Sequence, residues 1–317
     1  MSFIGIVRFA AALLLAAALA LAPQARAQGA AYQPVAVRHA LGSTLIEKRP
    51  QRVVALDMNE VDFLDQLSVP VAGMPKDFVP AFLDKYRQAG GIVDTGAIVQ
   101  PNMERVHAAR PDLILITSLQ AKHYEELSRI APTIHFDVDY GNSRAGHIEV
   151  IKEHLLTLGR IFGKEALARQ KAAALDARVR EARKVTAQRP EKALIVLHNN
   201  GAFSAFGVRS RYGFVFDALG VQPASATAEA GLHGQPVSSE FIRQADPDII
   251  YIVDRTAVME RRPALTAQTL GNPLLRQTKA WRHGRVIFAD PQAWYVTAAS
   301  VTSMGLIIDD VIAGYRN

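Results

Sequence analysis

Basic, imidazole and phenolic side chains follow several apolar segments of this sequence, the positions where α/β proteins usually bind ligands. Arg211 and Arg255 carry guanidinium groups, which stay charged and donate several hydrogen bonds, so both suit an anionic, oxygen-rich ligand. His233 and Tyr295 are a pair that can bind a metal, and phenolate is a hard donor suited to ferric iron. On spacing alone, loop packing or pairing with a nearby acid explains each residue better than a binding role does.

A phrase that begins with Glu occurs twice in the chain, at Glu104 and at Glu240. Each copy continues with six residues, then Pro-Asp, then an apolar run. This pattern predicts a short helix that is broken at Pro-Asp and followed by a buried strand. We therefore expect two similar lobes that bind a ligand between them, with one Glu at the same corner of each lobe. Either Glu can also stabilise the N-terminal end of its own helix.

The two copies differ at one position that bears on a ligand site. Alignment pairs Leu119 with Arg255, each fifteen residues after its Glu. Leu119 belongs to the rim expected for the first lobe, which carries Asp57–Asn59 and Ser118–Gln120. Since one member of the pair is apolar and the other is cationic, we expect a lopsided pocket with most of the ligand chemistry in the second lobe.

Short apolar runs that alternate with helical segments predict an α/β fold with a largely parallel sheet. Residues 146–188 have almost no strand signal, and their part from Glu165 to Gln188 is rich in strong helix formers. We therefore predict two Rossmann-like lobes, residues 28–163 and 189–317, joined by one long α-helix, residues 164–188, with the ligand cleft between the lobes. Strands are expected at 35–41, 51–56, 69–72, 134–137, 193–197, 249–253 and 286–289, and further helices at 59–67, 212–219 and 297–315.

The N-terminal residues have the pattern of an export signal. Arg8 supplies positive charge, an apolar run extends from Phe9 to Leu21, and Ala25-Arg26-Ala27 is a small-x-small cleavage site. We expect a signal peptide, residues 1–27, that is cleaved after Ala27. The run is too short for a comfortable membrane span, so an uncleaved anchor helix is the weaker alternative.

Composition excludes several classes of protein. The chain of 317 residues has no cysteine, which excludes disulfides, thiolate metal sites and a lipid anchor on an N-terminal Cys. The formal net charge is +6, but no Lys/Arg-rich block with aromatic residues is present, so a nucleic-acid partner is not expected. No nucleophile elbow, phosphate-cradling loop or Cys nucleophile occurs, and nothing else indicates catalysis.

The mature chain resembles periplasmic substrate-binding proteins of ABC import whose lobes are joined by a single long helix (class III). The two Glu phrases, Arg52–Leu56 and the helical stretch from Glu165 to Gln188 carry this resemblance. Within the class the chain is similar to binders of ferric catecholate siderophores. The matching segments are Ser204–Gly207, Ser210–Gly213, His233-Gly234, Val253–Arg255, Asp290-Pro291 and Trp294-Tyr295.

The resemblance implies ligand contacts for four residues. Arg211 and Arg255 would contact catecholate oxygens that bridge to iron, and Trp294 and Leu119 would also lie at the ligand. Relatives of this branch carry a third Arg where this chain has Leu119. The substitution removes one cation from the pocket and opens an apolar surface.

The resemblance also implies two roles outside direct ligand recognition. With tetradentate siderophores, His233 and Tyr295 would complete the octahedral shell of the iron. Glu104 and Glu240 would dock on basic residues of the membrane permease, and two carboxylates at equivalent corners suit a two-fold partner.

We therefore expect a monomeric periplasmic receptor that is neither an enzyme nor embedded in the membrane. It would capture a ferric, catecholate-type siderophore and deliver it to an inner-membrane ABC transporter, with ferric iron as cargo and no intrinsic cofactor. A hydroxamate siderophore, haem or a cobalamin is an alternative ligand that Leu119 leaves open. An enzyme that acts on a bound ligand and a scaffold without a ligand are the alternatives from other classes. The linking helix predicts modest closure of the lobes.

Overall fold

The computed structural model describes residues 32–136, 138, 146–225 and 233–316. The predicted signal peptide, residues 1–27, lies outside the described residues, so cleavage after Ala27 stays a prediction. Within the described part of the chain, no helix is long and apolar enough to cross a membrane.

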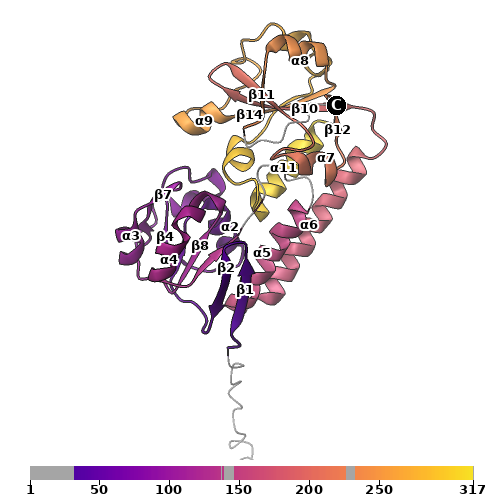
Figure 1. The fold of residues 1–317 in the computed structure, drawn as a ribbon. Coiled ribbons are helices and arrows are strands. Elements are labelled where there is room, and N and C mark those ends of the chain that lie inside the picture. The colour runs from indigo at the N-terminus through magenta and orange to yellow at the C-terminus, as the bar shows by residue number, and fades with distance from the viewer. Residues whose placement is uncertain (1–31, 137, 139–145, 226–232, 317) are drawn as a thin grey trace, which may run out of the picture. The chain divides into compact units, whose positions relative to one another are not determined.

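The first lobe is built on an all-parallel sheet of five strands (Figure 1). Three of these strands, β3 (Val53–Ala55), β8 (Leu113–Ile116) and β9 (Thr133–His135), are wholly buried, as short apolar strands covered on both faces should be. This confirms the prediction of a parallel sheet. The strand order is β5 (Val93–Asp94), β4 (Val71–Met74), β3 (Val53–Ala55), β8 (Leu113–Ile116) and β9 (Thr133–His135).

The second lobe is built on a mixed sheet. Its order is β13 (Gln235–Val237), β11 (Ala202–Phe206), β10 (Lys192–Asn199), β14 (Ile249–Asp254) and β15 (Val286–Phe288), with β12 (Gln222–Pro223) also paired to β10. β10, β14 and β15 are parallel, whereas β11 and β13 are antiparallel to their neighbours.

The β10–β11 hairpin was not predicted. β10 does not end at Leu197 but continues through Asn199, and the chain reverses at Asn200-Gly201. Both turn residues have positive φ, 48° and 85°, which an Asn-Gly pair adopts with little strain. The sequence signal for this hairpin was therefore present in the Asn-Gly pair.

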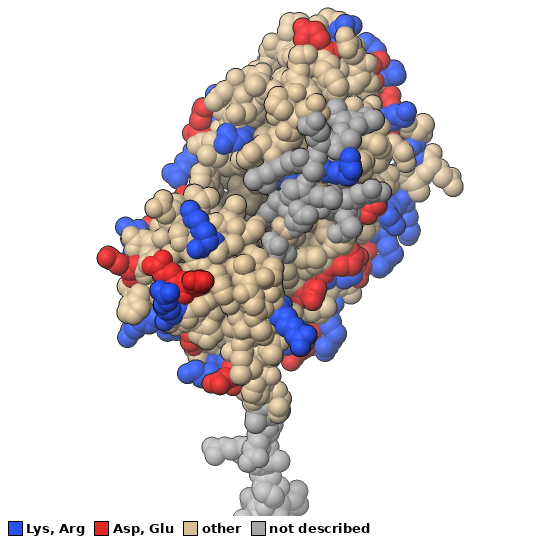
Figure 2. Space-filling view, in the orientation of Figure 1, with Lys and Arg blue, Asp and Glu red and all other residues tan. Residues whose placement is uncertain are grey.

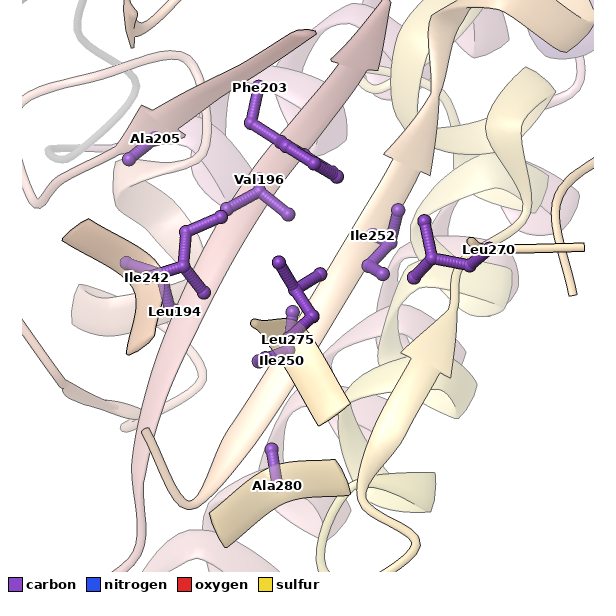
Figure 3. Close-up of a cluster of buried hydrophobic side chains, with 10 residues drawn as sticks. All are labelled: Leu194, Val196, Phe203, Ala205, Ile242, Ile250, Ile252, Leu270, Leu275 and Ala280. Carbon is purple, nitrogen blue, oxygen red and sulfur yellow. The ribbon is translucent and has the colours of Figure 1, made fainter. Parts of the chain in front are cut away.

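The core of the second lobe lies between its sheet and helix α8 (Ser239–Ala245), as Figure 3 shows. Leu194 and Val196 of β10 and Ile250 and Ile252 of β14 point toward the same layer, and Ile242 of α8 packs on them. All five side chains are almost completely removed from water, so hydrophobic burial holds the two central strands in register.

Two helices carry the chain from the first sheet to the second. α5 (His147–Phe162) follows β9, and α6 (Glu165–Thr186) leads to β10. They pack closely, because a Cβ added at Gly159 would come within 2.5 Å of the Cβ of Ala168. α6 lies where the linking helix was expected and packs against α5 and α11 (Val301–Ala313) (Figure 1). The lobe limits, residues 163 and 189, stay predictions.

The remaining elements are short. The β1–β2 hairpin is antiparallel, as is the small β6–β7 pair. On the face drawn in Figure 2, basic and acidic side chains of the described residues lie interspersed. The elements are β1 (Val35–His39), β2 (Gly42–Ile46), α2 (Met58–Gln66), η2 (Ala81–Tyr86), β6 (Gly96–Ala97), β7 (Gln100–Pro101), α3 (Met103–Ala108), η3 (Ser118–His123), α4 (Tyr124–Ile130), α7 (Gly213–Asp217), α9 (Arg255–Glu260), η4 (Leu275–Gln277), α10 (Lys279–Arg282) and the π-helical turn η5 (Gln292–Val296).

The repeated Glu phrase forms the same local structure in both lobes: a short helix, a break at Pro-Asp and a buried strand. The Asp of each copy holds the start of the neighbouring parallel strand. Asp112 accepts hydrogen bonds from the backbone N–H groups of Gln51 and Arg52, both at 2.8 Å. Asp248 accepts one from the N–H of Lys192 at 3.0 Å. The prediction of two similar lobes is confirmed by these matching contacts.

Helix α2 of the first lobe is bonded to the segment that precedes and begins α11. The carboxylate of Asp62 accepts hydrogen bonds from the backbone N–H of Thr302 at 2.8 Å and from its hydroxyl at 2.6 Å. The side-chain oxygen of Asn59 accepts a hydrogen bond from the N–H of Ala299 at 3.1 Å. Asp62 and Asn59 are buried, so these bonds brace α2 against α11 away from water.

Candidate functional site

A cavity of about 370 Å³ lies between residues of the two lobes. It is the size of a small-molecule site. Its lining combines an arginine, an imidazole, a phenol and two carboxylates with an extensive apolar surface. The lining residues are Asp57, Asp77, Phe78, Ile98, Val99 and Leu119 from the first lobe, and Arg211, His233, Val258, Met259, Tyr295 and Val296 from the second.

Both predicted arginines converge on Tyr295. Arg211 is buried, and its Nη2 donates to the backbone carbonyl of Tyr295 at 3.0 Å. Arg255 donates from Nε to the phenol oxygen of Tyr295 at 2.7 Å and from Nη1 to Asn199 at 3.1 Å. Their guanidinium carbons lie 5.2 and 5.6 Å from the centre of the Tyr295 ring, within cation–π range. Two positive charges therefore stand beside one oxygen donor at the cavity wall.

Tyr295 is held by the π-helical turn η5, a type of turn that is frequent at functional sites. The carboxylate of Asp290 accepts hydrogen bonds from the backbone N–H groups of Gln292 and Ala293, at 2.9 and 2.8 Å, and so fixes the start of the turn. The spacing from Asp290 to Tyr295 in the sequence thus has a geometric reason.

His233 lines the same cavity with an exposed ring. Desolvation lowers its pKa from the usual value, and the positive charges of Arg211 and Arg255 lower it further. The imidazole is therefore neutral near pH 7 and has a nitrogen lone pair for a metal. Gly234 follows with φ of 70°, and a Cβ there would lie 2.7 Å from the carbonyl oxygen of Ala205. A glycine is thus required for the chain to place His233 here.

His233 and Tyr295 supply at most two donor atoms to a metal. An octahedral ion held at this cavity would take its remaining ligands from the bound molecule. The residues present therefore suit a metal that arrives as part of a complex, as the sequence predicted.

Leu119 forms part of an apolar rim. Its side chain is 39% exposed, and two other lining residues, Val99 and Met259, are 57% and 43% exposed. Leu119 lies in the first turn of η3, where Thr117 accepts a hydrogen bond from its backbone N–H at 3.3 Å. Large apolar side chains left in water around a cavity mark a surface that a ligand can cover.

The structure does not bring Trp294 to the cavity, contrary to its predicted ligand contact. The side chain is fully buried, and its Nε1 donates to Asp310 at 2.8 Å. The ring stacks on Tyr251 with centres 5.9 Å apart, and the hydroxyl of Tyr212 donates to the Trp294 carbonyl at 3.0 Å. Trp294 therefore supports the turn that presents Tyr295. Successive residues of a helical turn point in different directions around its axis, so the adjacent side chains of Trp294 and Tyr295 separate.

A second hollow, of about 600 Å³, lies in the second lobe and is lined by His198 and Asp254. Nδ1 of His198 is 3.0 Å from the Asp254 carboxylate, and Nε2 accepts a hydrogen bond from the N–H of Gly201 at 2.9 Å. Asp254 also accepts from the N–H of Leu265 at 3.0 Å. These bonds connect the β10–β11 turn to the loop at Leu265. The pairing of His198 with Asp254 therefore has a structural role.

Asp77 and Phe78 are lining residues that the sequence reasoning missed. They follow strand β4, at the same edge of the sheet as the other rim residues. The predicted strand ended at Ala72, whereas β4 extends to Met74, so the residues beyond it were not considered. The rule that ligands gather at the carboxyl ends of parallel strands would have found them.

Glu104 and Glu240 are exposed and occupy the same position in their helices. The side chain of Asn102 caps α3 by accepting a hydrogen bond from the N–H of Arg105 at 2.9 Å. The side chain of Ser238 caps α8 in the same way, by accepting one from the N–H of Phe241 at 3.2 Å. In both cases the residue just before the helix supplies the cap, so neither Glu carboxylate is needed for capping. Both remain available on the surface for another partner.

Comparison with known proteins gives consistent matches. A family model described as periplasmic binding protein matches residues 53–293. The chain is 62% identical to the ferric-anguibactin-binding protein of Vibrio anguillarum, over 90% of this chain and 88% of that protein. It is 34% identical to the petrobactin-binding protein of Bacillus subtilis, over 89% of this chain and 88% of that protein. A solved siderophore-binding protein, bound to a complex between two molecules of acinetobactin and ferric iron, has a TM-score of 0.87 at 62% identity, covering 90% of this chain and 99% of the other.

Proposed function

The chain belongs to the periplasmic binding protein family, and we propose that it captures a ferric siderophore of the catecholate type for import by an ABC transporter. The convergence of Arg211 and Arg255 on Tyr295 at the cavity wall carries this proposal. The names of the similar proteins, which bind ferric anguibactin, petrobactin and ferric acinetobactin, support it. The family is one of binding proteins and not of enzymes, as the sequence predicted.

Ligand recognition divides between the two lobes. The guanidinium groups of Arg211 and Arg255 attract the anionic oxygens of the siderophore and donate hydrogen bonds to them. Leu119, Val99 and Met259 lose exposed apolar surface against the organic part of the ligand. Covering such surface contributes roughly 25 cal/mol per Å².

Ferric iron is cargo in this proposal and enters already bound to the siderophore. Where the siderophore leaves coordination positions open, the neutral imidazole of His233 and the phenol oxygen of Tyr295 are the protein atoms that fill them. Where the siderophore is hexadentate, the two side chains contact only its surface.

A fluorescence titration tests the proposal. Trp294 lies in the core next to Tyr295 in sequence, so a visible-absorbing ferric complex in the cavity is expected to quench the intrinsic emission. Tight, saturable quenching by a ferric bis-catecholate is the expected result. Absence of binding by every ferric catecholate, from protein whose circular dichroism is that of the folded state, would overturn it. The visible spectrum of the loaded protein separates catecholate iron from the alternative ligands, haem and cobalamin.

Delivery to the membrane is the second part of the proposal. The mature protein would reside in the periplasm after cleavage at Ala27 and act as a monomer. Glu104 and Glu240 would contact basic residues of the permease. Their equivalent, exposed positions in α3 and α8 support this role. Charge reversal to Lys at both positions is expected to abolish transport-linked stimulation of the permease ATPase in vesicles, while ligand affinity in solution is unchanged.

A further inference from the structure

Asp77 lies on the first-lobe side of the cavity, in the loop after β4. One of its carboxylate oxygens, Oδ1, is buried and has no hydrogen-bond partner among the residues that the structure describes. A buried carboxylate oxygen without a donor is strongly disfavoured, so a group of this kind in a ligand cavity is expected to gain its donor from the ligand.

The backbone beside Asp77 is unusual as well. Phe78, which also lines the cavity, has φ of 53°, in the left-handed region that bulky side chains rarely adopt. Such conformations persist only where the surrounding structure enforces them, and they cluster at ligand sites. The loop is therefore held in a shape that presents both residues to the cavity.

The cavity has opposite polarity on its two sides. Arg211 lines the cavity from the second lobe, where Arg255 adds a second positive charge behind Tyr295. Asp57 and Asp77 bring acids from the first lobe, but the carboxylate of Asp57 already accepts hydrogen bonds from Asn59 and Thr117. Burial raises the pKa of Asp77, and the negative charge of Asp94 acts in the same direction. The backbone N–H groups of Ile98 and of Asp77 itself, together with the charge of Arg261, oppose this rise. A hydrogen-bond donor on the ligand would favour the charged form further.

We propose that Asp77 is a specificity-determining residue, which accepts a hydrogen bond from a nitrogen-bearing donor group on the siderophore, on the side of the complex away from Arg211 and Arg255. This inference rests on the proposed function and deepens it. The ligand would then be a ferric complex with anionic oxygens at one side and an ammonium or other N–H group at the other. A complex with only anionic oxygens would meet repulsion from Asp77.

Arg261 provides the competing explanation. It lines a shallow crevice together with Asp77 and Asp94, at the edge of the cavity. No ion pair joins Arg261 to Asp77 in the part of the chain that the structure describes. If Asp77 served only to pair with Arg261 when the lobes close, it would favour all ligands equally. Selectivity between ligands distinguishes the two roles.

The test uses two synthetic ferric bis-catecholates that differ only in a side arm, one ending in an ammonium group and the other in a methyl group. Fluorescence titration gives the affinity of each for the mature protein and for Asp77→Asn. The expected result is that the wild type prefers the ammonium arm by about tenfold or more, as for a charge-assisted hydrogen bond. Asp77→Asn, which keeps the shape of the side chain, is expected to lose this preference.

Asp94→Asn is the matched control. It removes the same charge from a neighbouring, partly exposed acid that does not line the cavity and that pairs with Arg105 at 3.2 Å. The control is expected to keep the preference of the wild type. Thermal melting of each variant shows that it folds.

Three results would overturn the inference. Equal binding of both complexes by the wild type removes the donor contact but leaves the proposed function intact. An equal change in affinity for both complexes in Asp77→Asn would show that Asp77 acts only through a non-selective electrostatic effect or by pairing with Arg261. Failure of the wild type to bind either complex overturns the inference, whereas the proposed function is overturned only if every ferric catecholate fails to bind.

Discussion

At the scale of single residues, Arg211 and Arg255 each have two tasks. Both position Tyr295 through hydrogen bonds, and both give the cavity its positive charge. Their substitution would therefore disturb the donor atom as well as the electrostatic attraction. Mutations at other residues of the site separate metal coordination from electrostatic attraction more cleanly.

His233→Ala combined with Tyr295→Phe removes both predicted metal donors. We expect this double variant to weaken the binding of tetradentate ferric complexes by about a hundredfold, since loss of even an outer-shell partner of a metal ligand commonly costs 10- to 100-fold in affinity. Hexadentate complexes need no protein donor and are expected to change far less. The measurement is a titration with one complex of each kind, and His283→Ala, an exposed histidine outside the cavity, is the control. Equal loss for both kinds of complex would reject the metal-ligand role.

Leu119→Arg tests the lopsided charge of the pocket. The change adds a cation to the apolar rim, so complexes with greater negative charge are expected to bind several-fold more tightly at low salt, and the gain is expected to shrink as salt increases. Titration at low and high ionic strength measures it. A gain that is independent of salt would indicate packing instead of charge.

At the scale of elements, the Asp of each Pro-Asp pair fixes the start of a neighbouring parallel strand in its sheet. Asp112→Ala and Asp248→Ala remove acceptors of two and one backbone N–H groups. We expect each change to lower the free energy of unfolding by roughly 1–3 kcal/mol, with the larger loss at Asp112. Urea denaturation measures both. A loss at Asp248 that exceeds the loss at Asp112 would contradict the contact-based account.

The elements also show how far the sequence can predict the structure. The apolar runs around Val54, Ile114 and Ile250 were sufficient to predict buried strands, because a parallel strand is covered on both faces. The β10–β11 hairpin was missed because the polar residues His198 and Asn199 interrupt the apolar run. In the structure His198 is buried and its imidazole is paired with the carboxylate of Asp254.

The candidate site was predicted only in part, for a physical reason. The pairing of Arg211 and Arg255 with Tyr295 depends on how distant loops meet, which spacing along the chain cannot show. The position of these residues after apolar segments made them candidates, and resemblance to a family supplied their roles. It did not separate Trp294, which is buried, from Tyr295, which lines the cavity, because the π-helical turn that divides them has no simple sequence pattern.

At the scale of the whole molecule, buried histidines make the fold sensitive to acid. Burial lowers the pKa of His147 to about 4 and that of His154 to about 3, from an ordinary value of 6.5. In the unfolded chain both take up protons near pH 6.5, whereas in the folded protein they remain neutral. Stability from these residues is therefore present above pH 6.5 and is lost as the pH falls toward 4, by about 1.4 kcal/mol per pH unit for each histidine.

Buried acids act in the opposite direction. Burial raises the pKa of Asp57, Glu60 and Asp62, so the folded protein takes up protons at these groups before the unfolded chain does. Comparison with a variant isolates the histidine effect: His154→Leu is expected to reduce the decline of stability between pH 6.5 and 4. Urea denaturation across this range measures it. Parallel pH profiles for the variant and the wild type would contradict the assignment.

The bonds between α2 and the start of α11 limit how the lobes move. Asp62→Ala removes both hydrogen bonds to Thr302, so we expect a larger difference in radius of gyration between empty and loaded protein by small-angle X-ray scattering. Gln66→Ala removes a single, partly buried bond to Thr302 and serves as a milder control. An unchanged radius in Asp62→Ala would show that the linking helices alone restrict the motion.

Helix α2 has one further consequence for the ligand. Its cap, Asp57, lines the cavity, while Asn59 and Asp62, within the next five residues, are bonded to the other lobe. The gap between the lobes therefore cannot widen at this point without breaking buried hydrogen bonds, each worth roughly 1–3 kcal/mol when left unmade. We therefore expect helix α2 to limit the size of the ligand that the cavity accepts, independently of the charge of that ligand.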